Sequence, residues 1–287
     1  EHIKYMTITT VPTICVALIF FVIYNLINLP DENLNNVDYI ESINDYFYIS
    51  PILFIVPLIV IFMIYKKINP IVSLFVGTIL AAVFSLIFQS ELISNIITQS
   101  LSSDVTSYNI VMDSIISKTT IQTNSVFLDE LLTSGGMSGM LNTIWLVICA
   151  MIFGGVMEAI GALRSISLAL LSIAKSTINL FASTILSCIT VNITASDQYL
   201  SIVIPGKMFS DSYNDRKLSS LNLSRTIEDS GTVTSVLIPW NTCGAYQASV
   251  LNVSVYDYFV YAIFNWLSPI TTLIVASLNY KIKRIAN

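Results

Sequence analysis

The sequence has few charged residues, one histidine and no paired cysteines. Only 11% of the 287 residues are charged and the mean hydropathy is +0.76, whereas soluble domains carry about 25% charged residues. We therefore do not expect a water-soluble fold. The net charge of −5 leaves no basic surface that could neutralise phosphates, which argues against nucleic acid as a partner. The expected partner is the lipid bilayer.

The scarcity of histidine and the placement of cysteine argue against an enzyme. The only histidine, His2, lies at the N-terminus, so the chain lacks a mid-chain histidine for a metalloprotease or a histidine-activated nucleophile. The cysteines lie in apolar stretches without a CxxC pair, which predicts packing residues and neither a zinc site nor disulfides. They are Cys15, Cys149, Cys188 and Cys243. We predict no enzymatic activity and no cofactor.

Long apolar stretches dominate what is present. A membrane-spanning helix needs about 20 apolar residues with few charges. Five stretches run without interruption, at residues 11–29, 47–65, 70–88, 140–157 and 258–280. Two others have polar centres: 177–206 contains NITASDQY, and 230–256 contains SGTVTS, Pro239 and WNTCGAYQAS. Non-helical backbone survives at membrane depth only against protein or a water-filled cavity, so these interruptions predict a polar cavity.

The placement of lysine and arginine favours a re-entrant hairpin at 177–206. Short cytoplasmic loops are enriched in basic residues. If both ends of 177–206 emerge on one side and the other six stretches cross once, only Lys118 lies outside. Twelve of the 13 basic residues then obey the rule. A single crossing at 177–206 would move the seven basic residues from Lys207 onward outside, so we prefer the hairpin.

Asp197 lies at the predicted hairpin tip. Residues 199–206 span about 12 Å as a helix, near half of a hydrocarbon core of roughly 30 Å, which places Asp197 near the membrane centre. A carboxylate there costs at least about 2.5 kcal/mol, which favours a functional role. The alternative is that Asp197 only caps the following helix. The neutral oxygen-bearing residues of the tip are Asn192, Thr194, Ser196 and Gln198.

A second polar cluster begins at the adjacent acids Glu228 and Asp229. Pro239 removes one backbone donor and is expected to free the carbonyl of Ser235, so this stretch predicts a broken transmembrane helix. The alternative is a cytoplasmic capping pair followed by hydroxyls that bond back to their own backbone. The candidate ligands here are Ser230, Thr232, Thr234, Asn241 and Thr242. Glu158 is more simply a boundary residue, and Gly154 and Gly155 favour close helix packing.

These stretches resemble the NhaC-type Na⁺/H⁺ antiporter family of the ion transporter superfamily. The resemblance is carried by LLTSGGMSGM (131–140), FGGVMEAIG (153–161), NITASDQYLSIVIPGKMF (192–209) and NLSRTIEDSGTVTSVLIPWNTCGAY (222–246). Family members resemble helical carriers with re-entrant hairpins and broken helices in two related halves, and they are longer than this chain. The resemblance implies the later, C-terminal portion of such a protein. Two positions depart from the family pattern: Ser196 stands where glycine is usual, and Val236 where proline is usual.

The predicted fold is all-α: a polytopic membrane protein with about six crossing helices, a re-entrant hairpin and a broken transmembrane helix. Residues 1–90 are expected to form three transmembrane helices, and 91–139 an extracytoplasmic connector with an amphipathic helix near 104–117. Residues 140–287 form a transport core with the hairpin at 177–206, the broken helix at about 227–250 and the last helix at 258–280. We expect a multi-pass protein of the bacterial cytoplasmic (inner) membrane with a cytoplasmic C-terminus.

The expected activity is exchange of Na⁺ for H⁺ by alternating access. A bound cation favours an ionised carboxylate and expels its proton, so one site can hold either ion but not both. Asp197 and Asp229 are the predicted exchanging carboxylates and Na⁺ ligands, with Glu228 as an assisting acid. Rocking of one helix bundle against another would expose the site to each side in turn. The expected protein partners are the upstream half of the same protein and, left open, a second copy in a homodimer.

Four alternatives remain open at this point. A Na⁺/H⁺-coupled organic-anion exchanger, such as a malate/lactate antiporter, would have a cation or a half-helix N-terminus facing the anion. A channel would conduct without proton coupling, and a purely structural membrane subunit would tolerate loss of both acids. An intramembrane aspartyl protease is the most distant option, because the flanking sequences expected around its two acids are absent.

Overall fold

The protein is all-helical in a computed structural model that describes residues 2–28, 39–99, 105–121, 123 and 126–285. Within these ranges there is no β-strand. Two isolated bridges pair Thr119 with Ser134 and Leu218 with Arg284. The predicted all-α class is therefore confirmed.

The chain divides into two compact units. The larger unit combines Glu1–Leu29 with Asn142–Asn287, and the smaller unit is Pro30–Leu141. The first helix is thus separated from the next two in sequence and belongs with the C-terminal half of the chain.

The smaller unit is built around a pair of apolar helices. Its elements are α2 (Tyr39–Tyr46), η1 (Pro51–Phe54), α3 (Ile55–Tyr65), α4 (Pro70–Phe88), α5 (Ser90–Gln99), α6 (Ser107–Ile116), α7 (Val126–Leu132) and α8 (Gly136–Gly139). Asn69 caps α4 by accepting from the backbone N–H of Ile71, and Pro70 begins the helix. α3 packs against α4, and α6 packs against both α4 and α5. α6 falls at the position where the amphipathic helix was expected.

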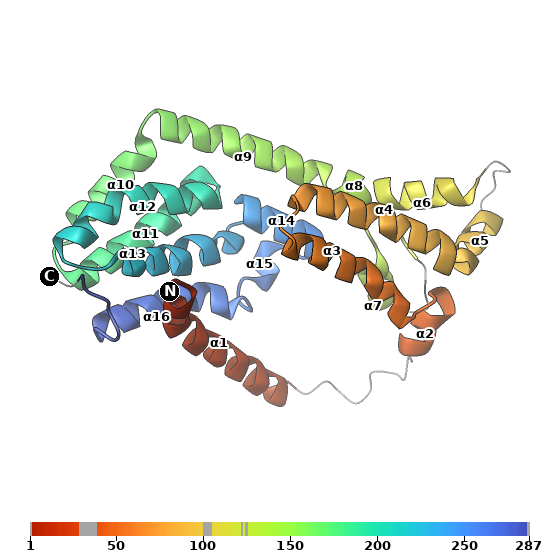
Figure 1. Cartoon of the computed structure of the whole chain (residues 1–287), viewed down its shortest axis with the longest axis horizontal. Coiled ribbons are helices and arrows are strands. Elements are labelled where there is room, and N and C mark those ends of the chain that lie inside the picture. Colours follow the sequence, from red (N-terminus) through yellow and green to blue (C-terminus); the bar gives the residue numbers. More distant parts are fainter. Residues whose placement is uncertain (1, 29–38, 100–104, 122, 124–125, 286–287) are drawn as a thin grey trace. The chain divides into compact units, whose positions relative to one another are not determined.

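The larger unit is centred on α11. Its elements are α1 (His2–Ile27), α9 (Leu141–Ala159), α10 (Ala162–Ser172), α11 (Thr177–Ala195), α12 (Gln198–Asp215), α13 (Ser220–Ile227), η2 (Glu228–Thr232), η3 (Ser235–Leu237), α14 (Thr242–Leu251), α15 (Val255–Tyr258) and α16 (Ile263–Ser277). α11 packs against α10, α12, α13, η2 and α16, and α1 packs against α13 and α16 (Figure 1). Leu180, Phe181, Cys188, Phe209 and Tyr213 form the buried apolar core.

Among the described residues, four helices are long and apolar enough to cross a membrane, which confirms a polytopic membrane protein. They are His2–Ile27, Pro70–Phe88, Gly136–Ala159 and Thr177–Ala195, and three shorter apolar helices are Pro51–Tyr65, Ala162–Ser172 and Ile263–Ser277. The first crossing begins earlier than the predicted residue 11. α11 measures about 28 Å at 1.5 Å per residue, so it is long enough to cross by itself. The re-entrant course of 177–206 therefore stays a prediction.

α11 and α12 form a helical hairpin. Ser176 caps the start of α11 by accepting from the N–H of Asn179. The chain reverses at Ser196, which adopts a left-handed conformation with φ of 59° and ψ of 17°. Asp197 then begins α12 as its N-cap. The two helices pack along each other, so the tip joins two long, well-buried elements.

The chain from α13 to α14 contains three kinds of helical turn. α13 runs without a gap into the π-helix η2, which is followed by the short 3₁₀-helix η3 and, after Pro239, by α14. The expectation that Pro239 frees the carbonyl of Ser235 is wrong, because the N–H of Ile238 donates to it over 3.4 Å. The tighter 3₁₀ geometry of η3 supplies this partner.

Candidate functional site

The hairpin tip and the broken helix are joined by two buried asparagines. Asn192 Nδ2 donates to the carbonyl of Gly231 over 2.7 Å and to Thr234 Oγ1 over 3.3 Å. Asn241 Nδ2 donates to both the carbonyl and Oδ1 of Asn192, each at 3.2 Å. Both asparagines are fully buried, so these bonds satisfy amides that water does not reach.

A second set of contacts lies where the hairpin turns. Gln198 Nε2 donates to the carbonyl of Thr232 over 3.3 Å, and Gln198 Oε1 accepts from Cys243 Sγ. The N–H of Thr242 donates to the carbonyl of Ser196 over 3.0 Å. The buried hydroxyl of Thr232 has no hydrogen-bond partner among the described residues. The structure thus brings the predicted residues of the hairpin and of the break into one polar junction.

Asp197 has a clear structural task at the tip. Its Oδ1 accepts from the N–H of Tyr199 over 3.2 Å, which is the bond of a helix N-cap. The side chain is half-buried rather than sealed from solvent. The hydroxyl of Thr194 makes no bond in the junction. It donates instead to the carbonyl of Thr190 on its own helix.

Asp229 belongs to the π-helix η2, which also contains Gly231 and Thr232 of the polar junction. Its side chain is only 2% exposed. Its Oδ2 accepts from Thr272 Oγ1 of α16 over 2.5 Å. The hydroxyls of Thr9 from α1 and Ser268 from α16 lie near this carboxylate. The hydroxyl of Thr9 donates to the carbonyl of Met6 over 3.1 Å, and that of Ser268 has no hydrogen-bond partner among the described residues. Three hydroxyl groups from two neighbouring helices therefore surround one buried acid.

Most of the hydroxyl groups that follow Asp229 hydrogen-bond to backbone carbonyls of their own helical segment. Ser230 Oγ donates to the carbonyl of Thr226 over 2.5 Å, and the hydroxyl of Thr234 donates to the carbonyl of Ser230. These bonds match the alternative in which hydroxyls bond back to their own backbone. Thr234 also accepts from Asn192, so its oxygen supports the junction between the two elements.

Glu228 has different surroundings from Asp229. It is half-buried and lines a shallow pocket of about 240 Å³ with residues of α12 and α13, among them Gly206, Ser220 and Ser224. No hydrogen bond joins Asp197, Glu228 and Asp229 to one another within the described parts of the chain. The three acids predicted from the sequence therefore occupy three different surroundings, and only Asp229 is buried.

α1 contributes to this site, which the apolar pattern of the sequence did not indicate. Its buried residues are Tyr5, Thr9, Thr13 and Ala17, which recur every four residues and form one face of the helix. Thr13 Oγ1 donates to Thr271 Oγ1 of α16 over 3.0 Å. The spacing of polar residues in an otherwise apolar span was the available signal. The similar spacing of Ser268 and Thr272 on α16 was a second one.

Arg225, one turn before Asp229, was also missed. The residue is fully buried, and none of its three guanidinium nitrogens has a hydrogen-bond partner among the described residues. Its guanidinium lies 4.5 Å from the centre of the Tyr5 ring. A desolvated cation–π contact contributes about 2 kcal/mol, whereas burying an unpaired charge costs several kcal/mol. The attraction to Asp229 is the other favourable charge interaction of this group.

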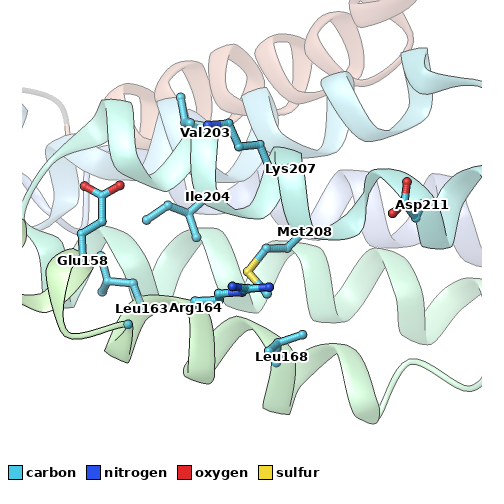
Figure 2. Close-up of a pocket in the computed structure, with 10 residues that line it drawn as sticks. Glu158, Leu163, Arg164, Leu168, Val203, Ile204, Lys207, Met208 and Asp211 are labelled. Carbon is cyan, nitrogen blue, oxygen red and sulfur yellow. The ribbon is translucent and has the colours of Figure 1, made fainter.

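A further pocket of the larger unit lies away from the junction. It has a volume of about 600 Å³ between the end of α9, α10 and α12. Four exposed charged residues line it: Glu158, Arg164, Lys207 and Asp211. Figure 2 shows Glu158 and Asp211 at opposite ends of the pocket, with Arg164 and Lys207 between them. Glu158 is thus an exposed pocket residue, in keeping with its interpretation as a boundary residue.

The fold and the junction define a polytopic, all-helical membrane protein whose polar interruptions face other helices. The chain belongs to the Na⁺/H⁺ antiporter family, whose model matches residues 1–279. The family is one of transporters, as the resemblance to NhaC-type proteins implied. No solved structure matches the chain.

Three relatives illustrate the similarity. The Na⁺/H⁺ antiporter NhaC of Bacillus subtilis is 29% identical over 277 residues, covering 96% of this chain and 58% of the relative. NhaC of Alkalihalophilus pseudofirmus is 30% identical, with 96% and 56% covered. The malate-2H⁺/Na⁺-lactate antiporter of Bacillus subtilis is 29% identical, with 93% and 54% covered. The chain spans little more than half the length of these relatives.

Proposed function

We propose that the protein exchanges Na⁺ for H⁺ across the bacterial cytoplasmic membrane and that Asp229 is the exchanging carboxylate. The observation that carries the proposal is the burial of this acid among hydroxyls of α1 and α16, with Thr272 bound to it. Na⁺ prefers oxygen ligands, and a carboxylate with neutral hydroxyls supplies them. Family membership and the names of the two NhaC relatives support Na⁺ and H⁺ as the ions.

Coupling follows from competition at one acid. A carboxylate held away from bulk water is unfavourable as a bare charge, so it holds either a proton or a metal cation. Binding of one ion displaces the other. We propose that the hairpin and the broken helix move together around this acid, because Asn192 and Asn241 tie them to each other. Such a unit can rock against other helices and expose the site alternately.

In this proposal Asp197 stabilises the structure around the site and is not the exchanging acid. Its half-buried position and its bond to the N–H of Tyr199 suit a residue that holds the hairpin tip in shape. The polar junction, including the unpaired hydroxyl of Thr232, would then position η2 and, through it, Asp229. Glu228 keeps the part of an assisting acid on the other side of η2.

The test compares two matched substitutions in the full-length protein, measured as Na⁺-induced collapse of a pH gradient in everted membrane vesicles. Asp229→Asn removes the charge and should abolish exchange. Asp197→Asn keeps a good N-cap without charge and should retain most of it. If Asp229→Asn exchanges like the wild type, the assignment of Asp229 is wrong. If Asp197→Asn also abolishes exchange in a folded protein, Asp197 must be counted among the exchanging acids.

An organic-anion exchanger is the second candidate, favoured by the similarity to the malate-2H⁺/Na⁺-lactate antiporter over 93% of this chain. Proton movement measured in the same vesicles distinguishes the cation exchanger from the organic-anion exchanger. Na⁺-driven proton movement without malate or lactate supports the cation exchanger. Proton movement that requires malate on one side and lactate on the other supports the organic-anion exchanger.

A further inference from the structure

The proposed function leaves one feature of the larger unit unexplained, the buried charge of Arg225. Its side chain is fully buried, and its three guanidinium nitrogens have no hydrogen-bond partner among the described residues. All other buried side-chain donors and acceptors that lack a partner in the described residues are uncharged hydroxyls, those of Thr232 and Ser268. Burying a cation without hydrogen bonds costs more free energy than burying an unpaired hydroxyl, so we expect Arg225 to have a function.

The surroundings of Arg225 point to one acid. α13 continues into η2 without a gap, so Asp229 follows Arg225 by about one helical turn, and the two charges attract each other. The face of the Tyr5 ring covers the guanidinium, and Tyr5 itself is held by its hydroxyl bond to Asn222 Oδ1 over 2.5 Å. The other titratable groups nearby are Tyr213 of α12, Cys188 of α11, Lys283 on the Tyr5 ring and Glu228, three residues further along the helix. Tyr213, Cys188 and Lys283 carry no negative charge at neutral pH. Glu228 is only half-buried and lines an open pocket with Gly206 and Ser220, so Asp229 is the buried acid of this helix.

We infer that Arg225 is the internal counter-ion of Asp229 and that its charge sets how readily the site releases Na⁺. This inference rests on the proposed exchange at Asp229. Without a bound ion, the buried pair of Arg225 and Asp229 is neutral. With Na⁺ or a proton bound, the same pair carries one net positive charge. Arg225 therefore favours the empty site, weakens the binding of either cation and speeds release.

Both loaded forms also carry the same net charge in this arrangement. A proton-loaded and a Na⁺-loaded site then experience the same electrostatic surroundings during the conformational change. The guanidinium of Arg225 makes no hydrogen bond to Asp229 and lies 4.5 Å from the centre of the Tyr5 ring, so its influence on the carboxylate acts through its charge. Arg225 is thus a positioning and affinity-setting residue and not itself an ion ligand.

The experiment measures Na⁺ affinity and turnover separately in the full-length protein. Arg225→Gln removes the charge and should lower the Na⁺ concentration for half-maximal exchange by about threefold or more, with a lower maximal rate. Arg225→Lys keeps the charge and should restore both values toward those of the wild type. Na⁺-dependent thermal stabilisation of the detergent-solubilised protein gives the same affinity change without turnover.

Arg216→Gln is the matched control, because Arg216 is an arginine of the same unit whose guanidinium donates to the backbone carbonyls of Ala174 and Ser176. This variant should lose stability and keep the Na⁺ dependence of the wild type. Should Arg225→Gln fail to fold, the double variant with Asp229→Asn is neutral again and should recover expression. Failure of the double variant to recover expression counts against a charge pair.

Three results would overturn the inference. One is an unchanged half-saturating Na⁺ concentration in Arg225→Gln, another is weaker Na⁺ binding in that variant, and the third is an equal effect of Arg216→Gln. The proposed function fails differently, since the wild type itself would then show neither Na⁺-induced proton movement nor stabilisation by Na⁺. Stabilisation of the wild type by Na⁺, with no change in Arg225→Gln, rejects only the role of Arg225.

Discussion

Asn192 in the hairpin binds the carbonyl of Gly231 in the π-helix, with 2.7 Å between its Nδ2 and that oxygen. Gly231 itself lies close to α12, where a Cβ atom at this position would be 3.1 Å from Ser201 Oγ. The π-helix is therefore held by both arms of the hairpin. Because Asp229 lies two residues earlier, the hairpin controls where the buried carboxylate sits although it does not touch it.

Asn192→Ala should weaken this connection. The substitution removes the 2.7 Å bond to the carbonyl of Gly231 and one of the two bonds made by the amide of Asn241, at a cost of about 0.5–1.5 kcal/mol for each bond. The carbonyl of Gly231 keeps the longer bond from Ser201, and Asn241 keeps the backbone carbonyl of residue 192. We expect a fall of several degrees in the apparent Tm of the detergent-solubilised protein. Asn179→Ala is the control, because Asn179 is an exposed asparagine of the same helix. Equal Tm values for the two variants would contradict the joining role of Asn192.

The paired glycines of α9 provide a second prediction. A Cβ atom on Gly154 would lie 2.5 Å from the backbone carbonyl oxygen of Ala195, just before the hairpin tip, whereas a Cβ atom on Gly155 would meet nothing within 4 Å. Gly154→Ala should therefore push α9 away from the tip and lower both stability and exchange. Gly155→Ala should leave both unchanged or slightly raise stability, since alanine favours the helix by about 1 kcal/mol over glycine. Thermal unfolding and vesicle exchange of the two variants are compared side by side, and a larger loss in Gly155→Ala would refute this packing.

The helix boundaries at Asp197 and Pro239 could be predicted from the sequence, because the backbone rules at these points are local. Asp197 is a good N-cap, Pro239 cannot continue a helix, and the polar residues near both could not face lipid. The packing role predicted for the glycine pair also holds at Gly154, although the sequence did not separate it from Gly155.

The sequence did not predict which acid is buried or what surrounds it. Asp229 is sealed by α1 and α16, which are more than 200 and about 40 residues away along the chain, and such contacts leave no local pattern around the acid. The π-helix was also missed, because no residue type requires it. The stripe of Tyr5, Thr9 and Thr13 was readable as a period of four, but the uninterrupted apolar stretch at 11–29 concealed it.

Ser196 gives a stability prediction that arises from the departure from the family pattern. It adopts φ of 59°, a left-handed conformation that costs a residue with a Cβ atom roughly 1 kcal/mol relative to glycine. Ser196→Gly should therefore raise the apparent Tm by a few degrees. Asn252→Gly is the control: Asn252 also has a left-handed conformation, with φ of 52°, but asparagine tolerates it better. A Tm gain for Asn252→Gly at least as large as that for Ser196→Gly would contradict this explanation.

Thr272 offers the most direct view of the proposed Na⁺ site. Its hydroxyl donates to Asp229 Oδ2 over 2.5 Å, and a hydrogen bond to a charged group contributes about 1.5–3 kcal/mol. Thr272→Val keeps the shape of the side chain and removes the hydroxyl, so both this bond and one oxygen near the carboxylate are lost. We expect the Na⁺ concentration for half-maximal exchange to rise about tenfold, in line with roughly 1.4 kcal/mol.

The matched control is the neighbouring threonine. Thr271 Oγ1 donates to the carbonyl of Leu267 and accepts from Thr13 Oγ1, and it makes no hydrogen bond to Asp229. Thr271→Val should therefore lower stability slightly and leave the Na⁺ dependence as it is. Thr272→Ser restores the hydroxyl and should recover the wild-type Na⁺ dependence. If Thr271→Val and Thr272→Val shift the half-saturating Na⁺ concentration equally, the effect belongs to the packing of α1 against α16, and the hydroxyl of Thr272 has no part in holding Na⁺.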